Sequence, residues 1–277
     1  MKISVILGHP RPDSLNHALA TAAAEGARGD GHQVRFHDLQ AEGFDPVLPP
    51  GEEAEGAPLP PDVEAHCREI AEADGIVIVH PNWWGKPPAI LAGWVDRVLR
   101  PGVAYRFLPG DGGEGVPVGL LRARSAVVLN TSNTDPRREA EVFGDPLQRI
   151  WVDCIFGLCG VRRVERRCFA AVATSRDQER RAWLEEARRI VARHYPAAPA
   201  AGRAAATGDG RDGLLHRLPD GRWVLAFWNE CGGVWHPLTV EGGRRTTART
   251  LEQLVERGAR VYGDRAEAEE AARALST

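Results

Sequence analysis

Long hydrophobic runs are absent from this sequence of 277 residues. The N-terminal stretch MKISVILGHP is apolar for only a few residues before Gly8 and Pro10, which is too short for the core of a signal peptide. No other stretch approaches the ~20 apolar residues that a membrane helix needs. We therefore expect a cytoplasmic protein that does not insert into a membrane.

An excess of charge of either sign is also missing. The formal net charge is −3, lysine occurs only at Lys2 and Lys86, and no acidic block forms a tail. Nucleic-acid-binding domains usually carry a basic stripe, so the composition gives no support to DNA or RNA as a partner.

The sequence also lacks several motifs that would indicate a metal-binding or nucleotide-binding site. The five cysteines include no C-x-x-C pair, and the nine histidines show no ligand spacing, so we predict reduced thiols and no metal site. There is no Walker A motif, no H-E-x-x-H and no G-x-S-x-G. The stretch GDGGEG over 110–115 formally matches G-x-G-x-x-G, but it follows no strand and its acidic residues would repel a pyrophosphate, so we interpret it as a loop.

The first 195 residues alternate short apolar β-rich runs with helical patterns. Runs such as GIVIV and AVVLN do not alternate with polar residues, which is typical of strands covered on both faces. Alternating strands and helices of this kind predict an α/β fold with a doubly wound, five-stranded parallel sheet of order 2-1-3-4-5. The predicted strands are Ile3–Leu7, Gln33–His37, Gly75–Val79, Ala126–Thr131 and Arg163–Ala171. Helices are predicted over 16–27, 62–73, 88–99, 145–160 and 176–195.

The remaining sequence changes in character. A Pro-, Ala- and Gly-rich stretch indicates a linker over 196–209. Residues 210–277 then show three strand patterns separated by turn signals at Asp220-Gly221 and at 231–233, followed by a helix at about 247–258 and a final Ala/Glu-rich helix. We predict a main domain over 1–195 and a small C-terminal α+β annex over 210–277.

Loops at the carboxyl ends of the strands are where open α/β sheets bind ligands, at the point where the winding direction reverses. After the first strand, GHPRPDSLNHALA combines a tight turn with a helix start, where free backbone N–H groups, the Ser14 hydroxyl and the Asn16 amide would suit a phosphate. An ordinary N-cap by Asp13 or Ser14 explains the same residues equally well. His9 would add charge or a donor to such a site, or be an ordinary loop histidine.

Two further loops share that edge. After the third strand, Asn82-Trp83-Trp84-Gly85 offers a flat aromatic wall, backbone donors and a glycine that permits close approach to a planar ring; alternatively, a tryptophan simply packs onto the sheet. After the fourth strand, residues 130–133 (Asn-Thr-Ser-Asn) would reach the edge of a heterocycle or only cap a turn. The three loops together predict a ligand site.

Residues 8–20, GHPRPDSLNHALA, together with residues 80–107, HPNWWGKPPAILAGWVDRVLRPGVAYRF, resemble the flavodoxin-like NAD(P)H:quinone oxidoreductase family, including its bacterial drug-activity modulators and potassium-efflux ancillary proteins. The resemblance covers roughly residues 1–195 and implies a flavodoxin-like fold. It implies an FMN cofactor, with FAD as a second possibility, and NAD(P)H as electron donor. The implied reaction is ping-pong: a hydride passes from NAD(P)H to the flavin, and two electrons then pass to a quinone, azo or nitro acceptor. The family's members are usually homodimers, with the flavin site at the interface.

Individual roles follow from the same resemblance. The phosphate of the flavin would be held by His9, Ser14, Leu15 and Asn16. Pro81, Asn82, Trp83, Trp84 and Gly85 would lie along the ring, and Thr131, Ser132 and Asn133 would reach its polar edge. Tyr105 and Phe107 would line the substrate pocket. Well-known relatives carry a tyrosine and a histidine in the loop after strand four as proposed proton relay, but this chain has Phe143 where that histidine would stand. Asn82, Asn133 and Tyr105 are left as candidates for polar assistance in catalysis.

Other functions remain open at this stage. A flavin-containing regulatory or ancillary subunit of an ion-efflux system would use the annex to dock a partner. A flavodoxin-like electron carrier is disfavoured, because such carriers are typically short and strongly acidic. The annex itself would be a meander packed on the main domain or, on a sharper hypothesis, a cover over the flavin site.

Overall fold

The computed structural model describes residues 1–107 and 117–197, and beyond them residues 215–218, 220, 222–229, 234–237, 253, 255 and 259–274. The chain divides into two compact units, Met1–Ala198 and Pro199–Thr277. The linker predicted over 196–209 and the loop predicted over 110–115 fall largely or wholly outside the described residues, so both stay predictions. None of the helices described is long and apolar enough to cross a membrane.

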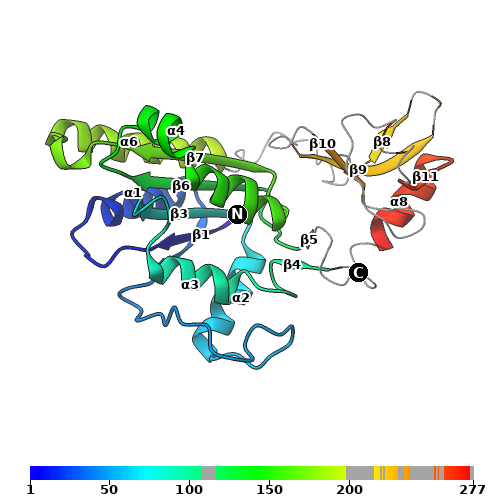
Figure 1. Ribbon diagram of the computed structural model, residues 1–277, viewed down its shortest axis with the longest axis horizontal. Helices are drawn as coiled ribbons and strands as arrows, with labels where there is room; N and C mark the ends of the chain where they lie inside the picture. Colours follow the sequence, from blue (N-terminus) through cyan, green and yellow to red (C-terminus); the bar gives the residue numbers. More distant parts are fainter. Residues whose placement is uncertain are drawn as a thin grey trace. The chain divides into compact units, whose positions relative to one another are not determined.

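A five-stranded parallel sheet forms the centre of the first unit (Figure 1). Its strands run in the spatial order β2-β1-β3-β6-β7. Since β6 and β7 are the fourth and fifth strands of this sheet along the chain, the predicted order 2-1-3-4-5 is confirmed. The strands are β1 (Lys2–Leu7), β2 (Gln33–Asp38), β3 (Gly75–Pro81), β6 (Ser125–Thr131) and β7 (Arg163–Phe169). Every residue of β3 and β6 is buried, as their unbroken apolar patterns predict.

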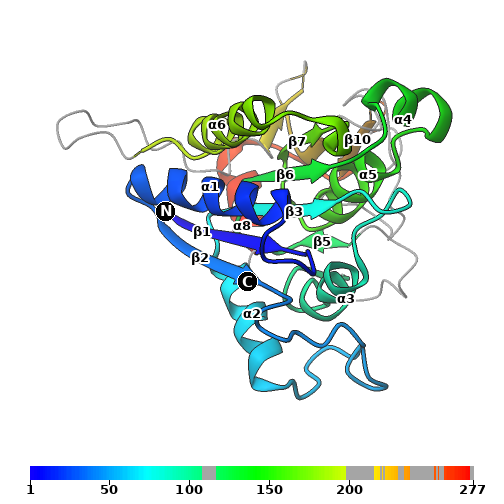
Figure 2. The ribbon, with the colours of Figure 1, turned by 90° about the vertical axis from the view of Figure 1, so that its left-hand side faces the viewer.

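Helices cover both faces of this sheet, as Figure 2 shows. On one face lie α1 (Leu15–Gly29) and α6 (Asp177–His194), whose alanines, leucine and isoleucine pack on β1, β3 and β6. On the other lie α2 (Pro61–Glu72), α3 (Ala89–Val98) and the π-helix η1 (Arg149–Phe156), around the buried rings of Trp94 and Trp151. Two apolar layers therefore enclose the sheet, and its polar loops are confined to the strand ends.

The structure departs from the predicted elements at several short segments. The helix predicted over 145–160 is a three-residue α5 (Pro146–Gln148) followed by η1. A helix α4 (Pro136–Phe143), which the sequence did not predict, begins after the cap residue Asp135 and ends at the left-handed Gly144. Two short strands, β4 (Tyr105–Arg106) and β5 (Val118–Gly119), form a separate ribbon, and a 3-10 turn η2 (Val172–Thr174) follows β7.

The second unit contains an antiparallel sheet in which β9 (Trp223–Asn229) pairs with β8 (Leu215–Arg217), β10 (Val234–Pro237) and β11 (Val261–Tyr262). Pairing of β8, β9 and β10 is the meander that the turn signals predict. The final helix is α8 (Arg265–Ala274). Val224 and Ala226 of β9 lie in a small core with Leu218 and Ala259. Residues 231–233 and most of 247–258 are outside the described part.

Gly75 is required where β3 begins, because the ring of Tyr195 fills the space beside it. A Cβ at Gly75 would lie 2.2 Å from Tyr195 Cε1. The Tyr195 hydroxyl accepts the N–H of Ile76 at 3.0 Å and lies 2.8 Å from the Ile76 carbonyl oxygen, so the ring cannot simply move away. We expect Gly75→Ala to lower the free energy of unfolding by about 1–3 kcal/mol, because an overpacked core must shift.

Gly26 of α1 supplies the matched control for that substitution. A Cβ there would make ordinary contact with Arg188 at 3.5 Å, and alanine favours a helix by about 0.5–1 kcal/mol over glycine. Denaturant unfolding should therefore show Gly26→Ala to be neutral or stabilising. Equal losses in the two variants would contradict this account of Gly75.

Candidate active site

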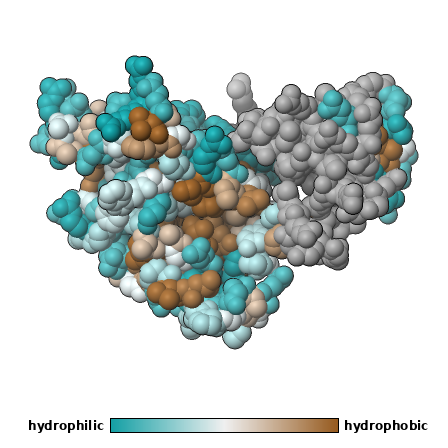
Figure 3. All heavy atoms as spheres, in the orientation of Figure 1, coloured by the Kyte–Doolittle hydropathy of each residue, from teal (hydrophilic) through white to brown (hydrophobic). Residues whose placement is uncertain are grey.

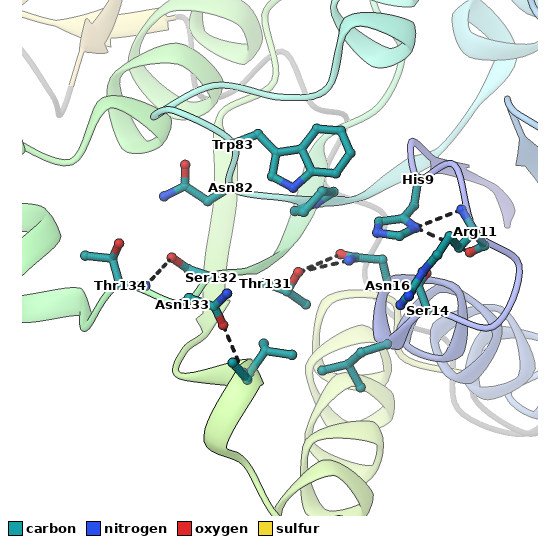
Figure 4. A pocket seen from close by; sticks show the side chains of 14 residues that line it. His9, Arg11, Ser14, Asn16, Asn82, Trp83, Thr131, Ser132, Asn133 and Thr134 are labelled. Carbon is teal, nitrogen blue, oxygen red and sulfur yellow. Dashed lines mark hydrogen bonds between the residues drawn. The ribbon is translucent and has the colours of Figure 1, made fainter.

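One pocket of about 310 Å³ lies at the carboxyl edge of the sheet, where the loops after β1, β3, β6 and β7 meet (Figure 4). Three of these loops are the ones that the sequence singled out. The pocket is lined by His9, Arg11, Ser14, Leu15, Asn16, Pro81, Asn82, Trp83, Thr131, Ser132, Asn133, Thr134, Val172 and Ala173. Its volume falls at the lower end of the range for small-molecule sites.

The N-terminus of α1 provides the positive end of the pocket. Ser14 caps the helix by accepting the His17 N–H at 3.1 Å, which is the ordinary N-cap that the sequence also allowed. The same geometry leaves the first N–H groups of the helix, at Leu15 and Asn16, without partners inside the helix. The helix dipole adds partial positive charge at this end. Capping and anion binding are therefore compatible at Ser14, and this end of the pocket suits a phosphate.

His9 lies beside that helix end, with one side of its ring held by Arg11. Its Nδ1 lies 3.1 Å from the backbone nitrogen of Arg11 and 3.3 Å from the Arg11 carbonyl oxygen, so Arg11 engages this side of the ring. Burial lowers the pKa of His9 and so favours the neutral form. The ring nitrogen away from Arg11 faces the middle of the pocket (Figure 4). The His9 ring also lies 5.9 Å from the ring of Trp83, centroid to centroid.

A tight turn separates the roles of the two tryptophans. Trp83 and Lys86 exchange backbone hydrogen bonds of 3.1 and 3.2 Å, and both central residues have positive φ, 58° at Trp84 and 71° at Gly85, as in a type I′ turn. The side chain of Trp83 lines the pocket, whereas that of Trp84 is 97% exposed at the turn tip. A bulky residue is strained in this left-handed region of backbone conformation. The backbone alone would therefore favour a smaller residue than tryptophan at position 84.

The far side of the pocket is a rigid pair of loops. Asn133 Oδ1 accepts the N–H of Ala173 at 2.9 Å, and the Ser132 carbonyl accepts the N–H of Val172 at 3.2 Å. Asn82 Oδ1 likewise accepts the N–H of Gly85 at 3.0 Å. Within the described part of the chain, no group partners the amide nitrogen of Asn82 or Asn133. Both are therefore available as donors to the polar edge of a ligand.

The structure brings ten of the predicted cofactor residues into one pocket and leaves others outside it. Trp84 and Gly85 belong to the turn but do not line the pocket, and Gly85 serves the turn geometry. Tyr105 and Phe107, predicted to line the substrate pocket, pack against each other at 5.9 Å between centroids, away from its lining. Asn130, grouped by sequence with Thr131, is fully buried under the site. The predicted cofactor residues did not include Arg11, Thr134, Val172 and Ala173, which also line the pocket. Val172 and Ala173 were missed because the loop after β7 carries no polar signal there.

Comparisons with known proteins place the chain in a family. A family model described by its flavodoxin-like fold matches residues 1–193. An uncharacterised NAD(P)H oxidoreductase of Haemophilus influenzae is 32% identical over 186 residues, which cover 65% of this chain and 89% of that protein. The chain belongs to the flavodoxin-like NAD(P)H:quinone oxidoreductase family.

Two other members of the family are similar over shorter or comparable stretches. An uncharacterised NAD(P)H oxidoreductase of Escherichia coli is 36% identical over 115 residues, covering 40% of this chain and 57% of that protein. The solved structure of an NAD(P)H:quinone oxidoreductase from Methanothermobacter marburgensis matches with a TM-score of 0.60 and 26% identity, covering 69% of this chain and 95% of that one. The names of these family members support the prediction that the chain is an oxidoreductase enzyme.

A cluster of potential metal ligands lies outside the pocket, although the histidine spacing predicted none. Ligand atoms of His37, Glu42 and His66 lie within 4.8 Å of one another. Their hydrogen bonds indicate a different use. His66 Nδ1 accepts the indole N–H of Trp94 at 3.2 Å, so the proton of the neutral ring sits on Nε2 and faces Glu42 Oε2 at 3.3 Å.

His37 is the charged member of this cluster. Its nitrogens lie 3.0 Å from Glu42 Oε1 and 2.9 Å from Glu69 Oε2, which makes both of them donors. Burial alone would lower the pKa of His37, but the bonds to Glu42 and Glu69 outweigh it and raise the pKa. Burial alone would raise the pKa of Glu42, but bonds from His37 and His66 lower it to about 2. The cluster fastens the loop after β2 to α2.

A defined pH dependence of stability follows. The contribution of His37 is complete below its ordinary pKa of 6.5 and is lost as pH rises through the raised folded value. That of Glu42 is present above 4.5 and is lost as pH falls toward 2. We expect the difference in melting temperature between wild type and His37→Gln to be largest between about pH 4.5 and 6.5 and smaller at pH 9. A difference that stays constant with pH would show that His37 is not charged in the folded state.

Proposed function

We propose that this chain is a flavin-dependent NAD(P)H oxidoreductase, which transfers two electrons by a ping-pong mechanism from NAD(P)H through FMN to a quinone or a related azo or nitro acceptor. The observation that carries the proposal is the convergence of a helix N-terminus, an aromatic side chain and two unpartnered amides on one pocket. The phosphate of a flavin would match the helix N-terminus, its ring would match the aromatic side chain, and its polar edge would match the two amides. The flavin would supply the hydride and electron chemistry.

The protein's own residues would bind and orient the cofactor. The N–H groups at Leu15 and Asn16, with His9 Nε2, would hold the phosphate. Trp83 would cover one side of the ring, and the amide nitrogens of Asn82 and Asn133 would donate to its polar edge. Donors fixed in this way stabilise negative charge that develops on a reduced ring. Asn82 and Asn133 are thus the groups of this pocket best placed to assist catalysis.

Trp83 and Trp84 give a matched test of this placement. We expect Trp83→Ala to weaken FMN binding by about tenfold, because stacking on an aromatic side chain contributes roughly 1–3 kcal/mol per base in comparable sites. Trp84→Gly should leave the affinity within about twofold, since its side chain points to solvent and glycine accepts the left-handed turn. Fluorescence titration measures both. A larger loss at Trp84 than at Trp83 would reverse the assignment.

A second cavity beside the pocket bears on whether the cofactor is FMN or the larger FAD. A hollow of about 330 Å³ shares Ser14 and Leu15 with the pocket and is also lined by Asp13, Ala18, Asp177, Arg180, Arg181 and Leu184. Two carboxylates accompany the two arginines in this hollow, so it offers no excess of positive charge for the second phosphate of FAD. We retain FMN as the proposal. Heat release and chromatography of the bound flavin tests it, and recovery of FAD alone would contradict it.

A homodimer with the site at the subunit interface is also proposed. Apolar side chains reach the surface of the first unit (Figure 3), and the exposed large apolar residues include Val142 and Phe143 of α4. Tyr105 and Phe107 do not line the pocket of their own chain, and an interface site would allow them to complete the pocket of a second copy. Four cysteines in the described part, Cys67, Cys154, Cys159 and Cys168, are free thiols, which supports a cytoplasmic location.

A further inference from the structure

A fully buried histidine lies directly beneath the segment that lines the pocket at Pro81. His80 Nδ1–H donates to the Pro81 carbonyl at 2.8 Å. Its Nε2 accepts the indole N–H of Trp151 and the amide N–H of Asn130, both at 2.8 Å. Burial, reinforced by the nearby Arg166, lowers the pKa of His80 to about 4, so the ring stays neutral near pH 7. His80 is therefore a fixed hydrogen-bond bridge and not a proton donor for the reaction.

This bridge continues across the sheet to β7. Arg166 NH1 donates to Asn130 Oδ1 at 3.2 Å, and its Nε donates to Gln148 Oε1 at 3.3 Å. The remaining nitrogen, NH2, pairs with Asp145. The Arg166 side chain is 10% exposed and that of Asp145 is 27% exposed, so these bonds are partly shielded from water. One guanidinium thus joins β6 to the corner between α4 and α5.

The corner between α4 and α5 also contacts the turn formed by residues 83–86. Asp145 is left-handed, with φ of 47°, and is followed by Pro146. A Cβ built at Gly85 would lie 3.1 Å from Pro146 Cγ, so the ring of Pro146 packs against the tip of the turn. The loop over 81–86 is consequently held at its root through His80 and at its tip through Pro146. Arg166 connects these two contacts, because it bonds both to Asn130, the partner of His80, and to Asp145, which precedes Pro146.

We propose that Arg166 is a positioning residue for the ring side of the cofactor pocket. By joining Asn130 to Asp145 and Gln148, it fixes the loop over 81–86 with Trp83 facing the pocket. The inference rests on the proposed function for the identity of the ligand, while the effect on the loop is independent of it. Arg166 contacts neither the phosphate end at α1 nor the pocket itself.

Arg167 provides a control in the same strand. It also pairs with a carboxylate, from Nε and NH2 to Glu186 of α6 at 2.6 and 3.2 Å, on the opposite face of the sheet. Arg166→Met and Arg167→Met each remove one guanidinium from β7 and one partly buried ion pair. The change in net charge is therefore shared by the two variants, whereas the Arg167 side chain, at 37% exposed against 10% for Arg166, is the less buried of the two. An effect on the loop should belong to Arg166→Met alone.

Hydrogen exchange of the protein without added flavin tests the effect on the loop. We expect the amides of Trp83 and Lys86, which bond each other across the turn, to exchange about tenfold faster or more in Arg166→Met than in wild type or Arg167→Met. Equal exchange in the two variants overturns the inference. This arm gives its answer even if the protein binds no flavin, an outcome that would overturn only the proposed function.

Binding of FMN and of riboflavin tests the effect on the ligand. Riboflavin has the ring without the phosphate, so a fault on the ring side weakens both ligands by the same factor. We expect Arg166→Met to weaken both by about tenfold or more and Arg167→Met to change neither by more than about twofold. Weakening of FMN alone would place the effect at the phosphate end and overturn the inference. So would unchanged affinity for both ligands despite a loosened turn.

Discussion

Replacing Glu52 with alanine is expected to lower the free energy of unfolding by about 3–5 kcal/mol, the largest stability loss that we predict for this chain. Arg97 of α3 donates from Nε and NH2 to the two Glu52 oxygens at 2.7 and 2.8 Å, and each side chain is only 4% exposed. Removing the carboxylate leaves a guanidinium charge in a site that water scarcely reaches. Its remaining bond, from NH1 to the Asp45 carbonyl at 2.7 Å, cannot balance that charge.

The pair fastens the long loop between β2 and α2 to the helix that follows the tryptophan turn. Arg100 adds to the attachment by donating to the Ala54 carbonyl at 2.6 Å. A double variant, Glu52→Leu with Arg97→Met, should lose less stability than Glu52→Ala, because no unpaired charge remains. The exposed pair Arg137–Glu141 is the control, and Glu141→Ala should cost no more than about 1 kcal/mol. Similar losses for Glu52→Ala and Glu141→Ala in denaturant unfolding would refute the account.

Replacing Asn16 with leucine is expected to weaken FMN binding by about ten- to a hundredfold, the largest effect on the pocket that we predict. Asn16 Nδ2 donates to Thr131 Oγ1 at 2.9 Å, and the Thr131 hydroxyl lies 3.2 Å from Asn16 Oδ1. Both residues are buried and both line the pocket. The pair joins the start of α1, where the phosphate would bind, to the end of β6, where the ring edge would lie.

Adding Thr131→Val to Asn16→Leu distinguishes an effect on FMN binding from an effect on the stability of the fold. Asn16→Leu leaves the Thr131 hydroxyl buried without its partner, which should cost about 1–3 kcal/mol in stability. Adding Thr131→Val removes that unsatisfied group and should recover most of the stability, while the affinity for FMN stays low. Recovery of the affinity in the double variant would show that the pair acts only through folding.

The sequence predicted the architecture well because its strongest signals are local. The unbroken apolar runs at 75–79 and 126–129 are buried, and the alternation of strands and helices indicated the order of the sheet. Helix α4 was missed, although Asp135, Pro136 and Gly144 are a proper cap, first turn and end. Its apolar residues Val142 and Phe143 are exposed, so it has no buried stripe to reveal its period.

The site was predictable only in so far as each loop was unusual by itself. Ser14, Trp83 and Thr131 each follow or end a strand of the predicted sheet, and topology alone brings such loops together. Whether Trp83 or Trp84 faces the pocket depends on the type of turn, which adjacent identical residues do not disclose. The bridge from His80 to Arg166 combines single residues of three strands, and nothing in their spacing connects them.

The measurement that tests the central claim most directly is an anaerobic two-step titration of the purified protein loaded with FMN. In the first step, NADH or NADPH should bleach the yellow absorption of the bound flavin without any acceptor. In the second step, after removal of the nicotinamide, menadione should restore the colour, as a ping-pong transfer requires. Asn16→Leu should bind and bleach correspondingly less flavin under the same conditions. A protein that cannot be loaded with FMN, or whose bound FMN neither NADH nor NADPH reduces, would contradict the account.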